Sequence, residues 1–146
     1  MGTRIILVSM LAVTITACGG KRSGPPEIVV DRTACSHCGM LISEPLYAAA
    51  YQVKDAEPRV FDDIGCLRKA AGSQAGPVTL WFHDADDRAW IGGERAVFVS
   101  SPDIQTPMGG GVIAFRDRAA ADRAAATHRG RVIDSVAALL SEKGKS

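Results

Sequence analysis

Short runs of β-branched and aromatic residues alternate with alanine-rich runs along this chain. The clearest strand pattern covers 78–83, where β-branched and aromatic residues alternate. The same chemistry, bounded by turn residues, predicts further strands at 27–31, 47–54, 59–61, 89–91, 96–99 and 112–115. Strands this short, interleaved with helices, are typical of an α+β fold.

Each predicted helix begins after a side chain that can accept hydrogen bonds from the free amides of the first turn. The predicted helices are 64–71 after Asp62 or Asp63, a helix to about 128 after Asp117, and a helix to about 140 after Asp134 or Ser135. Gly72 and Gly130 are expected to end the first two helices.

The order of strand, loop, strand, helix and glycine occurs twice, over 47–72 and over 96–130. Residue identity between the two stretches is poor, so only the order of elements indicates a duplicated α+β unit. We expect one folded domain over 27–142, with subunits at about 27–76 and 77–142.

The first residues have the pattern of a cleaved export signal. Arg4 precedes an apolar run over 5–13 that is too short to span a bilayer. The small residues before Cys18 resemble a lipobox, which predicts a lipoprotein signal peptide over 1–17 and an acylated Cys18. A secretory signal with a chance cysteine is the alternative. Glycine, serine and proline over 18–26 predict a flexible tether that holds the domain near a membrane.

Composition and charge narrow the functional class. Of the 146 residues, 47% are hydrophobic and 23% are charged, with a formal net charge of +1, as in ordinary globular proteins. There is no long basic run, so nucleic-acid binding has no electrostatic support. The chain has four cysteines. If Cys18 carries lipid, three thiols remain, and an odd number in an oxidising compartment indicates a reactive or metal-binding thiol.

The stretch Cys35-Ser-His-Cys-Gly-Met40 concentrates soft donor atoms: two thiols, one imidazole and one thioether. Thiolate and thioether ligands together favour Cu(I) over hard cations. His37 is a secondary ligand candidate, and so is Met40, although the apolar residues after Met40 favour a core position for it. Cys66, in the first turn of a predicted helix, is either a ligand candidate or a buried small hydrophobe.

The sequence leaves three other interpretations of Cys35 and Cys38 open. A structural zinc site usually needs about four ligands, and no second pair of closely spaced ligands is present. A redox dithiol needs a thiolate of lowered pKa, often at a helix N-terminus, whereas Pro45 and a predicted strand follow this motif. The third interpretation is a structural disulfide within the short loop.

Met108 lies between Pro107 and three glycines, in a loop with no helical or strand pattern. Glycine lets the backbone approach another segment closely, and proline restricts how the chain enters the loop. A thioether placed in this way suits Cu(I). The alternative is a loop methionine that packs onto the core.

Together these motifs resemble the NosL family of accessory lipoproteins for nitrous oxide reductase assembly. In addition to the lipobox, the resemblance rests on Cys35-Ser-His-Cys-Gly-Met40, Phe61-Asp-Asp-Ile-Gly-Cys66, Trp90 before Phe98-Val99, and Thr106-Pro-Met-Gly109 with Ala114-Phe115. It covers about residues 27–130. In this family's pattern a polar residue is more usual at the position of Gly110, and methionine at that of Leu67.

The resemblance implies two small ββα-type units with short mixed sheets and a C-terminal helix. It also implies a membrane-anchored, non-enzymatic Cu(I) chaperone outside the cytoplasm, which delivers copper to nitrous oxide reductase or a related cuproenzyme. We expect Cys35, Cys38 and Met108 to hold the metal, with Cys66, His37 and Met40 as secondary candidates. A membrane-tethered thiol-disulfide oxidoreductase that uses Cys35 and Cys38 is the alternative function.

Overall fold

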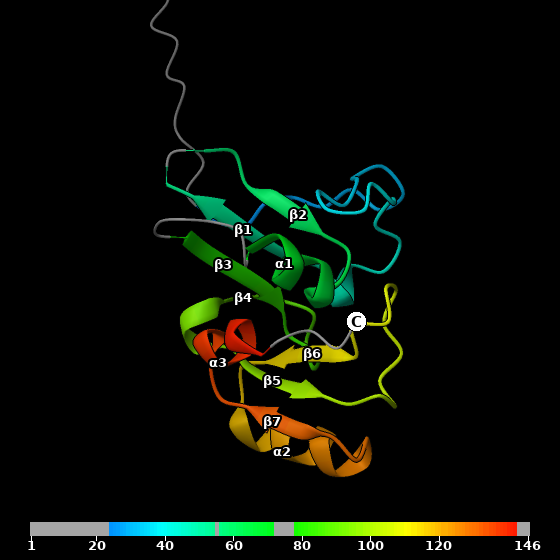
Figure 1. Ribbon diagram of the computed structural model, residues 1–146, viewed down its shortest axis with the longest axis vertical. Coiled ribbons are helices and arrows are strands. Elements are labelled where there is room, and N and C mark those ends of the chain that lie inside the picture. Colours follow the sequence, from blue (N-terminus) through cyan, green and yellow to red (C-terminus); the bar gives the residue numbers. More distant parts are fainter. Residues whose placement is uncertain (1–23, 55, 72–77, 143–146) are drawn as a thin grey trace, which may run out of the picture.

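The structure, a computed structural model, describes residues 24–54, 56–71 and 78–142. Within these ranges the chain forms two small antiparallel sheets, one above the other in the view of Figure 1, with helices packed against them. This arrangement confirms the α+β class. The predicted signal peptide, Cys18 and most of the tether lie outside the described residues, as does Gly72.

The first sheet has the strand order β2-β1-β3-β4. Its strands are β1 (Ala49–Val53), β2 (Arg59–Phe61), β3 (Val78–His83) and β4 (Trp90–Gly92), and the chain enters β1 through a short 3-10 helix, η1 (Pro45–Tyr47). Helix α1 (Ile64–Ala71) follows β2 and packs on β1 and β2. Ala49 pairs with both Phe61 and Phe82. The N-terminal end of β1 and the C-terminal ends of β2 and β3 therefore lie together at one end of the sheet.

The second sheet has the strand order β6-β5-β7. Its strands are β5 (Val97–Ser100), β6 (Val112–Phe115) and β7 (Arg131–Ile133), preceded by the 3-10 helix η2 (Gly93–Arg95). Helix α2 (Arg118–Thr127) packs on this sheet, and the final helix α3 (Val136–Ser141) packs on α1. None of the described helices is long and apolar enough to cross a bilayer.

The two sheets repeat one topology. In each, a hairpin is followed by a helix, and a third strand returns beside the first strand of the hairpin: β1-β2-α1-β3 and β5-β6-α2-β7. The predicted duplication is thus present as a ββαβ unit. Because β3 pairs with β1 along its length, the first sheet continues past residue 76, where the sequence suggested a subunit boundary.

One hydrophobic core joins the two units. The rings of Phe82 in β3 and Phe98 in β5 meet edge to face, with centroids 4.8 Å apart. Leu67 of α1 and Leu139 of α3 are fully buried in the same core. An isolated parallel bridge between Asp84 and Ala114 also connects the sheets, although the pairs within each sheet are antiparallel rather than mixed.

The helix caps follow the sequence prediction. Asp63 accepts a hydrogen bond from the amide of Gly65 in the first turn of α1. Asp117 caps α2 by accepting from the amide of Ala120 at 2.8 Å, and Ser135 begins α3. These bonds satisfy amides that have no partner within their own helix.

One strand prediction is wrong, and one strand was not predicted. The segment 27–31 forms no strand, because the amide of Thr33 bonds the carbonyl of Val29 at 2.8 Å and closes a turn, and Asp31 has a positive φ of 57°. Strand β7 was not predicted, because it has three residues and its only pairing is with β5, which is far away in sequence.

Candidate metal centre

The Cys35–Met40 motif forms a closed loop. Ala34 and Leu41 pair across its base in an isolated antiparallel bridge, and the amide of Cys35 donates to the carbonyl of Met40 at 2.8 Å. Gly39 has a φ of 78°, which glycine adopts without a steric cost. Its amide donates to the carbonyl of Cys35 at 2.9 Å. These bonds fix the backbone between the two cysteines.

Two hydrogen bonds attach this loop to β2. The amide of Ser36 donates to the carbonyl of Val60 at 2.7 Å, and the guanidinium of Arg59 donates to the carbonyl of Ser36 at 2.8 Å. Arg59 also donates to the hydroxyl of Tyr51 at 3.0 Å. The loop therefore stands beside the end of β2, where the chain continues into Asp62.

The junction between β2 and α1 supplies the carboxylate of Asp62 and the thiol of Cys66. Phe61 and Asp62 are both buried, and Asp63 caps the helix. Cys66 is the third residue of α1 and is also buried. Because Cys66 lies in the first turn of α1, its thiol faces the loop that carries Cys35 and Cys38.

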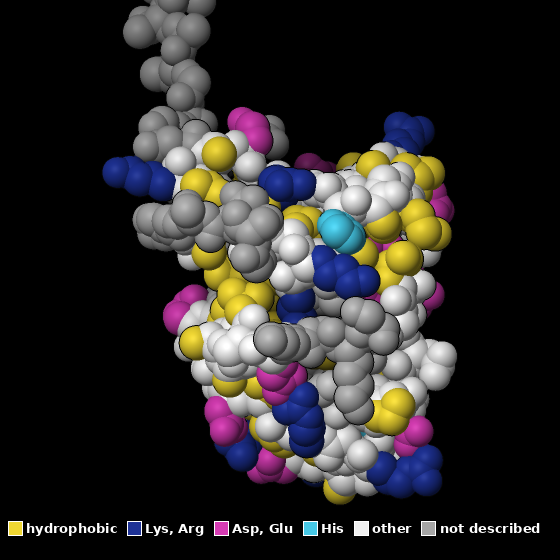
Figure 2. Space-filling view, in the orientation of Figure 1, with side chains coloured by type: hydrophobic (Ala, Val, Ile, Leu, Met, Phe, Trp, Pro, Cys, Tyr) yellow, Lys and Arg dark blue, Asp and Glu magenta, His cyan; other side chains and the backbone are white. Residues whose placement is uncertain are grey.

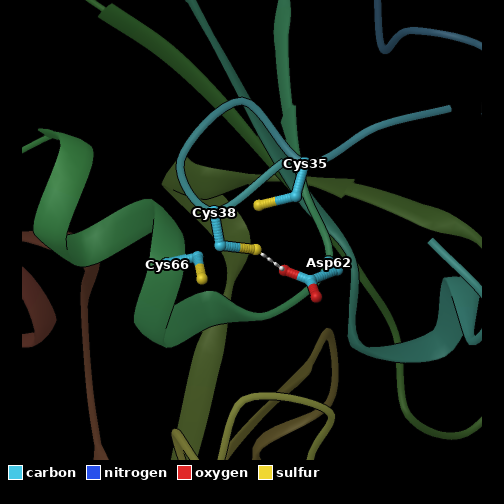
Figure 3. A group of neighbouring side chains, drawn as sticks. All are labelled: Cys35, Cys38, Asp62 and Cys66. Atoms are coloured by element: carbon cyan, nitrogen blue, oxygen red, sulfur yellow. Dashed lines mark hydrogen bonds between the residues drawn. The ribbon is translucent and has the colours of Figure 1, made fainter. Parts of the chain in front are cut away.

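Cys35, Cys38, Asp62 and Cys66 gather into one cluster, and Figure 3 shows them turned toward a common centre. The three sulfur atoms and a carboxylate oxygen all lie within 4.8 Å of one another. The thiol of Cys38 donates to Oδ1 of Asp62 at 3.8 Å. Cys35 and Cys66 are buried, whereas Cys38 is exposed. The cluster is therefore enclosed by the protein and open at Cys38.

Burial and the neighbouring negative groups favour the neutral forms of two of these thiols, Cys35 and Cys66. Burial raises the pKa of the Cys35 thiol. Burial also raises the pKa of Cys66, and the negative forms of Cys35, Asp62 and Cys38 raise it further. A metal ion would offset this repulsion. The thiols release their protons on binding, and the positive ion is held by the thiolates that form.

The loop that carries Met108 is attached to the same end of α1. The amides of Met108 and Gly110 donate to Oδ2 of Asp63 at 3.2 and 3.3 Å. The side chain of Met108 is 43% exposed, so it does not pack onto the core. The structure thus brings the backbone of Met108 next to the helix that holds Cys66.

The other predicted candidates lie outside the cluster. His37 is exposed in the turn between the two cysteines. Met40 is 55% exposed, so the core position favoured from the sequence is wrong; Ile42, two residues later, takes that place and is fully buried. The sequence analysis missed Asp62 as a member of the cluster. Its signal was the Asp62-Asp63 pair, since only one of two adjacent carboxylates is needed as a helix cap.

The donor set limits the chemistry of the cluster. Cys35, Cys38 and Cys66 are free thiols, so the structural disulfide between the first two is not formed. Three thiols and a carboxylate suit a soft or borderline ion, Cu(I) or Zn(II). The first helical element after Cys38 is the short η1, seven residues later, so the motif does not open an α-helix as the dithiol of an oxidoreductase often does.

Comparison with known proteins gives a family and a similar solved fold. The NosL family model matches residues 26–137. The fold is also similar to the crystal structure of the copper chaperone NosL from Shewanella denitrificans, with a TM-score of 0.63 and 18% identity. That match covers 77% of this chain and 94% of the other chain, and at this identity it establishes the fold alone. No curated protein matches.

Proposed function

Because the chain belongs to the NosL family, we propose that it is a Cu(I)-binding chaperone that holds the ion with Cys35, Cys38 and Met108. Its cargo goes to a copper-dependent client enzyme, nitrous oxide reductase or a related cuproenzyme outside the cytoplasm. The protein is an accessory binding protein and not an enzyme.

One observation carries the proposal: three thiols from two separate segments converge within 4.8 Å. Cu(I) is held by a few soft ligands, and thiolates are among the best. Cys35 and Cys38 come from one loop, and Cys66 comes from the first turn of α1. Cys66 and Asp62 lie close enough to the thiols of Cys35 and Cys38 to serve as reserve donors.

The Met108 thioether makes the site selective. Thioether sulfur adds little to the binding of zinc, whereas it is a good ligand for Cu(I). The loop of Met108 is tied to α1 through Asp63, and its side chain is exposed. In the proposed site, the thioether of Met108 completes a low-coordinate set of ligands together with the thiols.

The surroundings of the site suit transfer of the ion to another protein. Met40, Leu41 and Met108 are exposed large hydrophobic residues, and Cys38 is an exposed thiol. Figure 2 shows hydrophobic side chains gathered on the side of the molecule where Figure 1 places the loops around 28–44 and 101–111. An exposed thiol within an apolar rim allows a client to approach and exchange ligands.

The anchoring proposal comes from the N-terminal sequence. A signal peptide over 1–17 would export the chain, and lipid on Cys18 would hold the domain at a membrane surface through the tether. Stable retention needs more than one acyl chain. Wild type should take up labelled fatty acid and partition into detergent, and Cys18→Ala should not; equal labelling of the two would end the lipoprotein interpretation.

Competition with a Cu(I) chelator tests the function. The reduced protein should bind about one Cu(I), prefer it to Zn(II), and lose affinity in Cys35→Ser and Cys38→Ser. Ser36→Ala is the matched control, because it changes the same loop and removes no sulfur donor. Unchanged affinity in both site variants would reject the proposal. Rapid disulfide reduction of insulin, lost in Cys35→Ser, would instead support the oxidoreductase.

A further inference from the structure

Asp63 is a fully buried carboxylate with an unusual number of partners. Its Oδ1 accepts from the amide of Gly65. Its Oδ2 accepts from the hydroxyl of Thr106 and from the amides of Met108 and Gly110. A helix cap needs only the first of these bonds, so the other three require a separate explanation.

These bonds join two segments that are far apart in sequence. Gly65 belongs to α1, next to Cys66. Thr106, Met108 and Gly110 belong to the loop between β5 and β6, 43 to 47 residues after Asp63. A single carboxylate therefore connects the helix that carries a thiol of the cluster to the loop that carries the thioether.

The backbones at this junction are in close contact. A Cβ atom at Gly110 would lie 2.2 Å from Oδ1 of Asp63, and one at Gly65 would lie 3.1 Å from the Cα of Gly110. Neither position has room for a side chain without movement of the loop. Gly110 is thus the residue that allows the loop to reach the carboxylate in this chain.

We infer that Asp63 is the positioning residue of the copper site, which sets where the Met108 thioether stands relative to the thiols. The inference rests on the proposed function and extends it. Asp63 is not part of the thiol cluster, and both of its oxygens accept hydrogen bonds from protein donors. Its neighbour Asp62 is the carboxylate that faces the thiols, so the two adjacent acids have different roles.

Asp63→Asn is the primary variant. It keeps the size of the side chain and one oxygen, but it turns an –NH₂ group toward amides that are donors themselves. We expect Cu(I) affinity to fall about 10- to 100-fold, the usual effect of losing a residue that orients a metal ligand. Thr106→Val removes only one loop bond and should cause a smaller loss in the same direction.

Three further measurements separate positioning from general stability. Adding Met108→Leu to Asp63→Asn should cause no further loss of affinity, because both changes remove the same thioether. X-ray absorption at the copper edge should show one sulfur ligand fewer in Asp63→Asn, as in Met108→Leu. In the metal-free protein, the amides of Met108 and Gly110 should exchange hydrogen slowly, and Asp63→Asn should make them exchange quickly.

Asp84→Asn is the matched control. Asp84 is also buried, and its carboxylate accepts from the amides of Asp86 and Arg116 at 3.0 and 3.2 Å rather than from Thr106, Met108 or Gly110. The Asp84→Asn variant should have a lower free energy of unfolding and the same copper affinity as wild type.

The outcomes separate the two proposals. Wild-type affinity in a folded Asp63→Asn, or losses that add in the double variant, would overturn the role of Asp63 and leave the chaperone function intact. If Asp63→Asn does not fold, unchanged affinity and sulfur count in Thr106→Val overturn it instead. If wild type itself binds no Cu(I), the proposed function fails and this role fails with it.

Discussion

The two ββαβ units have the same strand order, yet within the described part of the chain the thiol cluster lies in the first unit. At the start of α1 the chain reads Phe61-Asp-Asp-Ile-Gly-Cys66, and at the start of α2 it reads Phe115-Arg-Asp-Arg-Ala-Ala120. The aromatic residue and the capping aspartate occupy the same places in both. The fold thus provides the same junction of strand, cap and helix twice. The side chains at a few positions next to the cap decide which chemistry each junction has.

Those positions differ in chemistry. The third helical residue is Cys66 in α1 and Ala120 in α2. The residue before the cap is Asp62, which is buried against the thiols, in the first unit. In the second unit it is Arg116, which forms a surface ion pair with Asp87 at 3.1 Å. Surface pairs of this kind contribute little to stability.

The largest expected effect is the loss of a thiol from the first junction. Cys35→Ser and Cys38→Ser should each weaken Cu(I) binding by more than about 100-fold, beyond the range typical of residues that only orient a ligand. Ser36→Ala, in the same loop, keeps the backbone bonds and should bind as wild type does. Competition with a chelator measures all three variants. A loss in Ser36→Ala as large as in the cysteine variants would mean that loop conformation, not sulfur, controls binding.

The second effect is a rise of copper affinity with pH. The pKa values of Cys35 and Cys66 are raised, so a proton must leave each thiol that becomes a ligand. Protons therefore compete with copper at low pH, and apparent affinity should increase about tenfold per pH unit for each proton released. Competition titrations from pH 6 to pH 8 measure the slope. The slope should be smaller in Cys35→Ser and unchanged in Met108→Leu; a flat profile in wild type would exclude thiolate ligands.

A smaller effect distinguishes the two caps. Asp117→Ala removes the cap of α2 and should lower stability by about 1 kcal/mol, without changing copper affinity. Asp63→Asn should change both properties, because Asp63 also holds the Met108 loop. Thermal unfolding and chelator competition on the same samples measure the pair. Loss of copper affinity in Asp117→Ala would show that the second unit contributes to the site.

Local patterns predicted most of the fold. The bounds of α1 and β6 are those expected from the sequence, because a cap, a breaker or a β-branched run marks each end. β7 had no such mark and exists through its pairing with β5. The turn after Val29 uses backbone groups that a strand over 27–31 would need, and the apolar composition of that segment gave no sign of it.

The site was predictable only in part. The spacing of Cys35 and Cys38 identified one loop, and the glycines after Met108 identified another. That the chain brings Cys66 and Asp62 against the first loop depends on strand pairing across long stretches, which residue chemistry alone does not specify. The division of roles between Asp62 and Asp63 likewise follows from which way each side chain points, and the sequence shows only that both are acids.

The central claim is that one Cu(I) is held between the Cys loop and the Met108 loop. A crystal structure of the reduced, copper-loaded protein, with anomalous scattering recorded at the copper edge, tests it most directly. The account predicts a single copper peak in contact with Sγ of Cys35, Sγ of Cys38 and the thioether sulfur of Met108. A copper peak away from these cysteines, or one bound by them with the Met108 side chain still in solvent, would contradict it.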